Sequence, residues 1–134
     1  MTNVPALTNL SELIASLSVR RRGGRFAVTT HRADPGGPAD ARIAEDEGVT
    51  LIVPVAQAAA HGWAYDGEFA WLTLGVPSAL DAVGLTAAVA DVLARRGIPC
   101  NVLAGFHHDH LLVPQDRADE ALAALAELSA RGLG

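Results

Sequence analysis

The stretch from residue 69 to residue 114 constrains the fold of this chain most, because it reads without interruption as strand, turn, helix, strand, hairpin tip and strand. Residues 69–76 alternate as the two-residue period of a pleated strand requires, with a set expected to face the core: Ala70, Leu72, Leu74 and Val76. Residues 84–96 predict a helix with one buried apolar stripe: Leu85, Ala88, Val89, Val92 and Leu93. Gly97 ends that helix, since glycine accepts the left-handed conformation of a C-terminal cap. Residues 98–106 and 110–114 then predict two strands joined by a tip.

A final helix over residues 116–131 completes the order strand, helix, strand, strand, helix. This order is typical of the ferredoxin-like fold, in which an antiparallel sheet carries both helices on one face. The sequence therefore predicts an α+β protein built from ferredoxin-like units.

The first part of the chain predicts a reduced version of the same plan. Asn9 and Glu12 have the spacing of a capping box ahead of a helix of about ten residues, residues 25–30 and 49–53 predict strands, and residues 55–61 predict a short helix. Residues 18–24, with three consecutive arginines, and residues 41–48, with clustered acids, are expected to be a loop and a solvated connector. The alternatives are that the arginines bind an anion and that the acidic residues bind a divalent metal ion.

Two units are therefore expected in tandem. The N-terminal half, residues 1–64, is expected to lack its first strand and to have a shortened second helix. The C-terminal domain, residues 65–134, is expected to be complete.

The segment Asp81-Ala82-Val83-Gly84-Leu85, followed at fixed distances by Ala88, Val89, Leu93, Gly97 and Ile98, resembles the first strand-to-helix signature of the ACT domain. Residues 45–54, 82–89 and 100–114 are similar to a family of short bacterial proteins with two ACT-like units. The resemblance implies tandem βαββα units, a regulatory role that senses an amino acid, and side-by-side pairing of units. It departs from the common pattern at Val83, where proline is usual, and at Thr86, where leucine is frequent.

Composition limits the partners and the location. Fifteen acidic against ten basic residues give a formal net charge of −5, which argues against nucleic acid, whose binders need a basic surface. The single cysteine, Cys100, excludes an internal disulfide and is expected to be a small buried hydrophobe instead of a nucleophile. No apolar run approaches the roughly 20 residues that cross a bilayer, and the first residues lack the features of a signal peptide. We expect a cytoplasmic protein without membrane contact.

The sheet face opposite the core set carries Phe69, Trp71 and Thr73. Large aromatic side chains on an uncovered sheet face would form an exposed apolar patch, and such patches usually mark an interface. We expect a second sheet, from the other half or from another chain, to cover this face, with a homodimer as the commonest arrangement.

A candidate ligand site lies at the turn of residues 77–86. The start of a helix presents unpaired backbone N–H groups, so the carboxylate of an amino acid can bind there without a basic side chain. Val83, Gly84, Leu85 and Thr86 would supply these donors, and Gly84 has no side chain to block the ligand.

The ACT resemblance adds polar side chains to this site, because it implies that Asp81 and Asn101 contact polar groups of the ligand, Asp81 its ammonium. Ser78 completes the expected ligand-binding set. The alternative is that Ser78 and Asp81 cap the helix and that Asn101 binds backbone.

A second candidate is the string His107-His108-Asp109-His110, which has the ligand types that Zn²⁺ or Ni²⁺ prefers. On a tight hairpin tip, adjacent side chains diverge, so His61 or His31 would have to complete a metal site. The alternative is that Asp109 and His110 hold the turn through bonds to backbone. We expect no bound cofactor.

Support for catalysis is weak. The sequence has no nucleophile elbow, phosphate-binding loop, dinucleotide fingerprint or zinc helix. Ser78, Asp81 and His107 are residue types that occur together in catalytic sites, but their spacing in the sequence does not define a geometry.

Together these patterns predict a regulatory protein that binds a small molecule, an amino acid or related carboxylate, acts through a dimer interface and is not an enzyme. The alternatives are a ligand-free dimerisation module and a metal-binding protein that uses residues 107–110.

Overall fold

The computed structural model describes residues 10–76 and 84–132. The elements follow one another as α1 (Leu10–Ala15), β1 (Ser18–His31), β2 (Ala41–Glu45), β3 (Gly48–Pro54), α2 (Val55–His61), β4 (Phe69–Gly75), α3 (Leu85–Arg95), β5 (Asn101–Ala104), β6 (Asp109–Pro114), a short 3-10 helix (Gln115–Arg117) and α4 (Ala118–Arg131). The α+β class and the ferredoxin-like plan predicted from sequence are confirmed.

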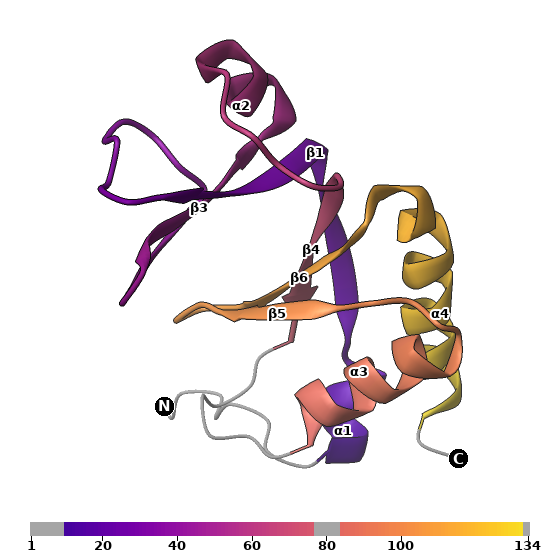
Figure 1. Ribbon diagram of the computed structural model, residues 1–134. Helices are drawn as coiled ribbons and strands as arrows, with labels where there is room; N and C mark the ends of the chain where they lie inside the picture. Colours follow the sequence, from indigo (N-terminus) through magenta and orange to yellow (C-terminus); the bar gives the residue numbers. More distant parts are fainter. Residues whose placement is uncertain (1–9, 77–83, 133–134) are drawn as a thin grey trace.

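All strands of the described residues join one antiparallel sheet in the order β2-β3-β1-β4-β6-β5. Strand β1 pairs with β3 through its second part and with β4 through its first part. The expectation that the other half of the chain covers the open sheet face as a second sheet is therefore wrong. The strands of that half extend the same sheet sideways instead (Figure 1).

Strand β1 corrects the expectation of a loop at residues 18–24, because the three arginines lie within this 14-residue strand. The pairing register shifts between Arg22 and Phe26, and Gly24 in this interval has φ +89°. A glycine tolerates this left-handed conformation, so the strand bends here at a bulge instead of ending. The bend lets β1 pair with β4 through its first part and with β3 through its second part.

Strand β2 corrects the expectation of a connector at residues 41–48. Ala41 to Glu45 pair with β3 around a tight turn at Asp46 and Glu47. The strand lies at the edge of the sheet and leaves most of its side chains exposed, so its charged residues remain in water. Charged side chains are a common protection of edge strands, which is why a polar stretch forms a strand here.

The sheet contains two overlapping four-stranded arrangements, β5-β6-β4-β1 and β2-β3-β1-β4. Strands β1 and β4 belong to both, so each unit completes its sheet with a strand of the other. In the first unit, β1 holds the place of the leading strand, contrary to the expectation that this strand is missing. What this unit lacks is a helix between β1 and β2, where residues 32–40, rich in proline and glycine, make the connection.

The helices lie on one face of the sheet. Helices α1, α3 and α4 pack together (Figure 1) over a core formed with alternate residues of β4 and β6, such as Leu72 and Leu111. Helix α2 covers the other end through Ala58, which packs against Ala27 and Leu51. Among the described residues, no helix has both the length and the apolar character needed to cross a membrane.

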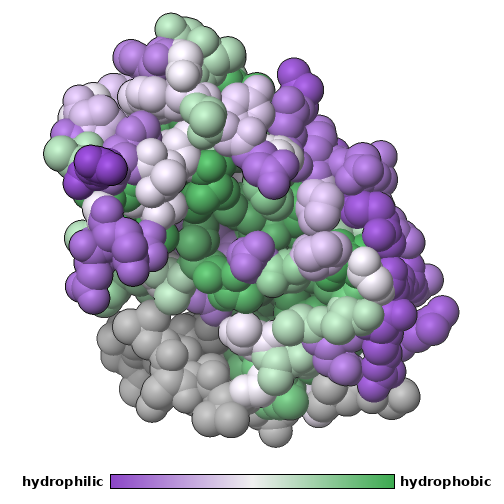
Figure 2. Space-filling model, in the orientation of Figure 1, coloured by the Kyte–Doolittle hydropathy of each residue, from purple (hydrophilic) through white to green (hydrophobic). Residues whose placement is uncertain are grey.

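The opposite face of the sheet, called here the open face, has its own small core. Phe26, Ile52, Trp71 and Leu112 pack there and are each 2–3% exposed. The Trp71 ring lies 5.5 Å from the Phe26 ring between centroids, and the Arg22 guanidinium carbon lies 4.2 Å from the Trp71 centroid. Figure 2 shows hydrophobic residues gathered near the middle of the view, with hydrophilic ones around them. With only 3% of its surface exposed, Trp71 is covered within the chain and is no exposed patch.

Candidate functional site

The turn that the sequence singles out lies largely outside the described residues, and with it Ser78, Asp81 and Val83. The described part of the site begins at Gly84, which stands directly before α3 with φ +96°. A Cβ atom built on Gly84 would lie 3.1 Å from Leu10 Cδ2. Glycine is therefore favoured both by the backbone conformation and by the packing of Leu10.

Helix α3 begins with backbone donors that have no acceptor within the helix. Its first internal bond runs from Ala88 N–H to the Gly84 carbonyl, at 2.9 Å. The N–H groups of Leu85, Thr86 and Ala87 thus have no acceptor within the helix, which is the arrangement that binds anions at helix N-termini. The Leu85 side chain is buried in the core, whereas Thr86 is exposed. Of these two residues, Thr86 is therefore placed to meet a ligand, whereas the Leu85 side chain is not.

The structure does not bring Asn101 to the start of α3. Asn101 begins β5 and pairs with Leu112 of β6, whose side chain belongs to the open face. Paired residues of an antiparallel ladder point to the same face, so exposed Asn101 lies on the open face while α3 packs on the other.

The histidines of residues 107–110 have different environments. His107 and His108 are exposed at the hairpin tip, and the His107 ring lies edge-on to Phe106, with 5.1 Å between centroids. His110 lies on the open face opposite Thr73. Within the described residues, no three His, Cys, Asp or Glu side chains are placed to hold one metal ion.

The other two histidines lie near the opposite end of the sheet, against Trp63. The His61 ring stacks on Trp63 at 4.4 Å between centroids, and the His31 ring meets it edge-on at 4.7 Å. These contacts give His31 and His61 a packing role beside α2.

The proton of His110 can be placed from its partners. Trp71 Nε1–H donates to His110 Nδ1 at 3.2 Å, and because an indole nitrogen only donates, Nδ1 must be an acceptor. The Thr73 hydroxyl, 3.0 Å from the same nitrogen, must then donate to it as well. His110 is therefore neutral, with its proton on Nε2.

The charges around His110 favour the same neutral state. Burial lowers the pKa of His110, the positive charges of Arg22, His108 and Arg20 lower it further, and the nearby Asp109 opposes them. Desolvation likewise raises the pKa of the half-buried Cys100 thiol, which disfavours the reactive thiolate.

A hollow that the sequence reading missed lies where β1 meets β4. This seam cleft, as we call it, has a volume of about 190 Å³ and is lined by residues of three segments: Ser18, Arg20, Thr73, Gly75 and His108. Reading residues 18–24 as a loop concealed it. The alternation of polar Ser18, Arg20 and Arg22 with Val19 was the available signal, since it places all three polar side chains on one face of a strand.

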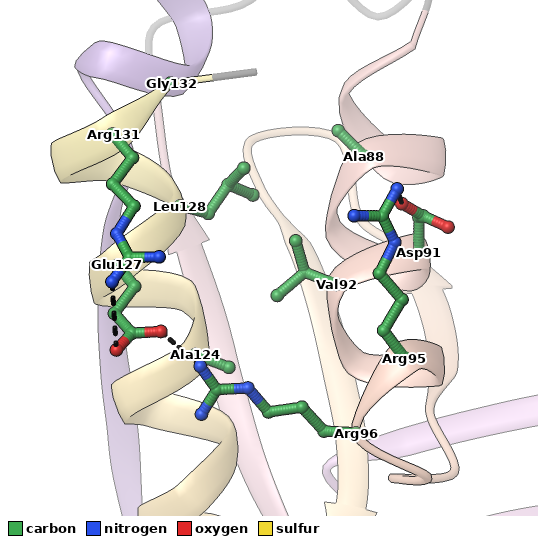
Figure 3. A pocket seen from close by; sticks show the side chains of 10 residues that line it. All are labelled: Ala88, Asp91, Val92, Arg95, Arg96, Ala124, Glu127, Leu128, Arg131 and Gly132. Atoms are coloured by element: carbon green, nitrogen blue, oxygen red, sulfur yellow. Dashed lines mark hydrogen bonds and ion pairs between the residues drawn. The ribbon is translucent and has the colours of Figure 1, made fainter. Parts of the chain in front are cut away.

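A second hollow of about 260 Å³ runs between α3 and α4 (Figure 3). Its apolar floor includes Val92 and Leu128, and its charged rim is paired internally, for example between Arg96 and Glu127. Because the rim charges have partners, this groove offers a ligand less free hydrogen-bonding capacity than the seam cleft.

Two family models match adjoining parts of the sequence that overlap slightly, residues 5–70 and residues 67–127, and both describe the ACT domain. The chain belongs to the ACT domain family. No curated protein matches the sequence.

The chain is also similar to solved structures. A Vibrio cholerae protein of unknown function, described as a possible transport protein, is 36% identical with a TM-score of 0.80, over 90% of this chain and 95% of that chain. A putative C-terminal regulatory domain of aspartate kinase from Porphyromonas gingivalis is 15% identical (TM-score 0.59, 83% of this chain and 95% of that one). The regulatory subunit of aspartate kinase from Thermus flavus is 12% identical (TM-score 0.55, 84% and 95%). The last two share the fold.

Proposed function

We propose that this protein is a regulatory module, not an enzyme, that binds a free amino acid or a related small carboxylate. The observation that carries the proposal is the start of α3, where Gly84 opens the helix and three backbone N–H groups have no acceptor within it. Such a terminus attracts a carboxylate through its N–H groups and the helix dipole. Membership of the ACT family supports the regulatory role.

The proposed ligand site keeps six of the residues expected from sequence: Ser78, Asp81, Val83, Gly84, Leu85 and Thr86. Within it, the backbone at Leu85 and Thr86 receives the carboxylate, and Asp81 receives the ammonium. Thr86 is exposed on the first turn of α3, which supports access of a ligand to its backbone N–H. Asn101, also expected there from sequence, is left out of this site because it lies on the open face.

Isothermal titration calorimetry on the full chain tests this site. Asp81→Ala is expected to weaken amino-acid binding by about 1–3 kcal/mol, which is the cost of removing one charged hydrogen-bond partner. The matched control is Asp119→Ala, since the Asp119 carboxylate is 97% exposed on α4. An Asp81→Ala variant with the affinity of the wild type would exclude the proposed role of Asp81.

The proposal also includes two ACT units, residues 1–64 and 65–134, and action through a homodimer in the cytoplasm. Partly exposed apolar residues on the sheet, Val28 and Ile43 among them, support an interface. Light scattering after gel filtration tests the dimer: twice the chain mass is expected. A chain mass at every concentration would refute it.

The same exposed residues support a second candidate function, a dimerisation module without ligand. This candidate predicts a stable dimer that no amino acid alters.

A further inference from the structure

The seam cleft is built from both units. Ser18 and Arg20 come from β1, Thr73 and Gly75 come from β4, and His108 comes from the tip between β5 and β6. The pairing register sets Ser18 opposite Gly75 and Arg20 opposite Thr73. Side chains directly opposite one another in an antiparallel ladder are neighbours, with Cβ atoms about 4.5–5.5 Å apart. The four strand residues thus form a compact block.

Among these four strand residues, Arg20 is the one that carries a charge. The chain has ten basic residues, all arginine, and eight of them form ion pairs with carboxylates: Arg21, Arg22, Arg25, Arg42, Arg95, Arg96, Arg117 and Arg131. Within residues 10–76 and 84–132, the Arg20 guanidinium has neither an ion pair nor a hydrogen bond. A free guanidinium beside a cleft is suited to bind a carboxylate through two parallel bonds.

The two hydroxyl groups of the cleft face it as hydrogen-bond acceptors, whereas the Arg20 guanidinium is a donor. The Ser18 hydroxyl donates its proton to the Gly75 carbonyl at 3.1 Å, and the Thr73 hydroxyl donates its proton to His110 Nδ1. Each hydroxyl has a single proton, so both oxygens present only acceptor lone pairs to the cleft. An ammonium group, which has three donors and no acceptor, matches such oxygens.

Gly75 keeps the cleft open. A Cβ atom built on Gly75 would lie 2.7 Å from Ser18 Oγ, so any other residue at this position would displace the Ser18 side chain. The cleft is also small, since pockets for drug-sized ligands occupy roughly 300–1,000 Å³ and this one measures about 190 Å³. Its size suits a ligand no larger than an amino acid.

We propose that the seam cleft is a second binding site, which holds the head group of an α-amino acid with its carboxylate on Arg20 and its ammonium on Ser18 Oγ and Thr73 Oγ1. The site lies on strands of the open face, whereas α3 packs on the other face of the sheet. The inference rests on the proposed function for the class of ligand, but not for the place where it binds.

Amide NMR on the ¹⁵N-labelled full chain separates the two places, because each has its own glycine. Gly75 reports on the seam cleft and Gly84 on the start of α3. The probes are the twenty free amino acids. For each one that binds, the analogue without the amine is added, such as acetate for glycine or propionate for alanine. Arg20→Gln is the test variant, and Arg95→Gln, another exposed arginine, is the matched control.

Binding in the seam cleft is expected to shift the Gly75 amide signal. Arg20→Gln should weaken that effect at least tenfold, Arg95→Gln should not, and the analogue without an amine should bind at least tenfold more weakly. The spectrum of each variant shows directly whether it is folded.

Other outcomes overturn one proposal or both. If the Gly84 amide signal shifts and the Gly75 signal does not, the seam site is overturned and the proposed function stands. The same holds if the Arg20→Gln variant binds with the affinity of the wild type. Shifts at Gly75 without Gly84 would support the seam site and remove the ligand from the start of α3. No shift at either glycine with any amino acid would overturn both.

Discussion

Replacement of Trp71 by alanine tests whether the open face of the sheet is a true core. Trp71 is 3% exposed although no helix of the described chain covers it, and it contacts the Phe26 ring, the Arg22 guanidinium and His110 Nδ1. A buried aromatic side chain removes about 150–250 Å² from water, which at about 25 cal/mol per Å² corresponds to roughly 4–6 kcal/mol as an upper bound. Alanine keeps one methyl group and the site relaxes in part, so we expect a loss of about 3–5 kcal/mol.

Urea unfolding followed by circular dichroism measures this loss of unfolding free energy. The matched control is Phe106→Ala, because Phe106 is an aromatic residue that is 79% exposed at the hairpin tip. Its replacement should change the stability by less than about 0.5 kcal/mol. If Trp71→Ala costs less than about 1 kcal/mol, the ring is surface and the reasoning about a second core is wrong.

Three further predictions concern single residues. The pKa of His110 is lowered from its ordinary value of 6.5, so the unfolded state binds the proton more readily and the free energy of unfolding should rise with pH just below 6.5. The variant His110→Asn keeps an acceptor near the Nδ1 position and should reduce this pH dependence. Urea melts between pH 5 and 8, roughly the range of histidine titration, measure it. Gly84→Ala should cost about 1–3 kcal/mol in urea unfolding because of φ +96°, whereas Gly23→Ala, with no atom within 4 Å, should be nearly neutral; equal effects would contradict the strain. Arg117 donates to the Arg96 carbonyl at 2.9 Å at the end of α3, so Arg117→Gln should lower the melting temperature by an amount equivalent to about 1 kcal/mol; an unchanged melting temperature would rule out this capping role.

The C-terminal half could be predicted well because the period of its hydrophobic pattern changes sharply from one element to the next. The two-residue alternation of β4 gives way to the helical stripe of α3, and Gly97 marks the helix end with φ +69°. Local sequence determines such features, since each depends on neighbours within one or two turns.

The first half was harder because its strands depend on distant partners. Three successive arginines read as a loop, yet they form a strand because β4 offers them a ladder about fifty residues away, as in the pairing of Arg22 with Trp71. Strand β2 likewise forms because β3 pairs with it, although its side chains stay in water. Hydrogen bonding to a neighbouring strand overrides local composition in both places.

For the candidate site, sequence located the start of α3 but not the seam cleft. The donors at Leu85 and Thr86 follow from helix geometry alone. The cleft requires knowledge that Ser18 lies opposite Gly75 and Arg20 opposite Thr73. Only the register supplies that information, and a shift of one residue would turn these side chains to the other face.

The claim that this chain binds an amino acid is tested most directly by a thermal-shift screen of the full chain against the twenty amino acids, with Zn²⁺ and Ni²⁺ salts and a chelator as further arms. A ligand at one hundred times its Kd stabilises the native state by about 2.7 kcal/mol, which for a domain of this size corresponds to a rise in melting temperature of roughly 10 °C. We predict such a rise, dependent on concentration, with one or a few amino acids. A melting temperature that no amino acid raises, or one that rises only with metal and returns with the chelator, would contradict the account.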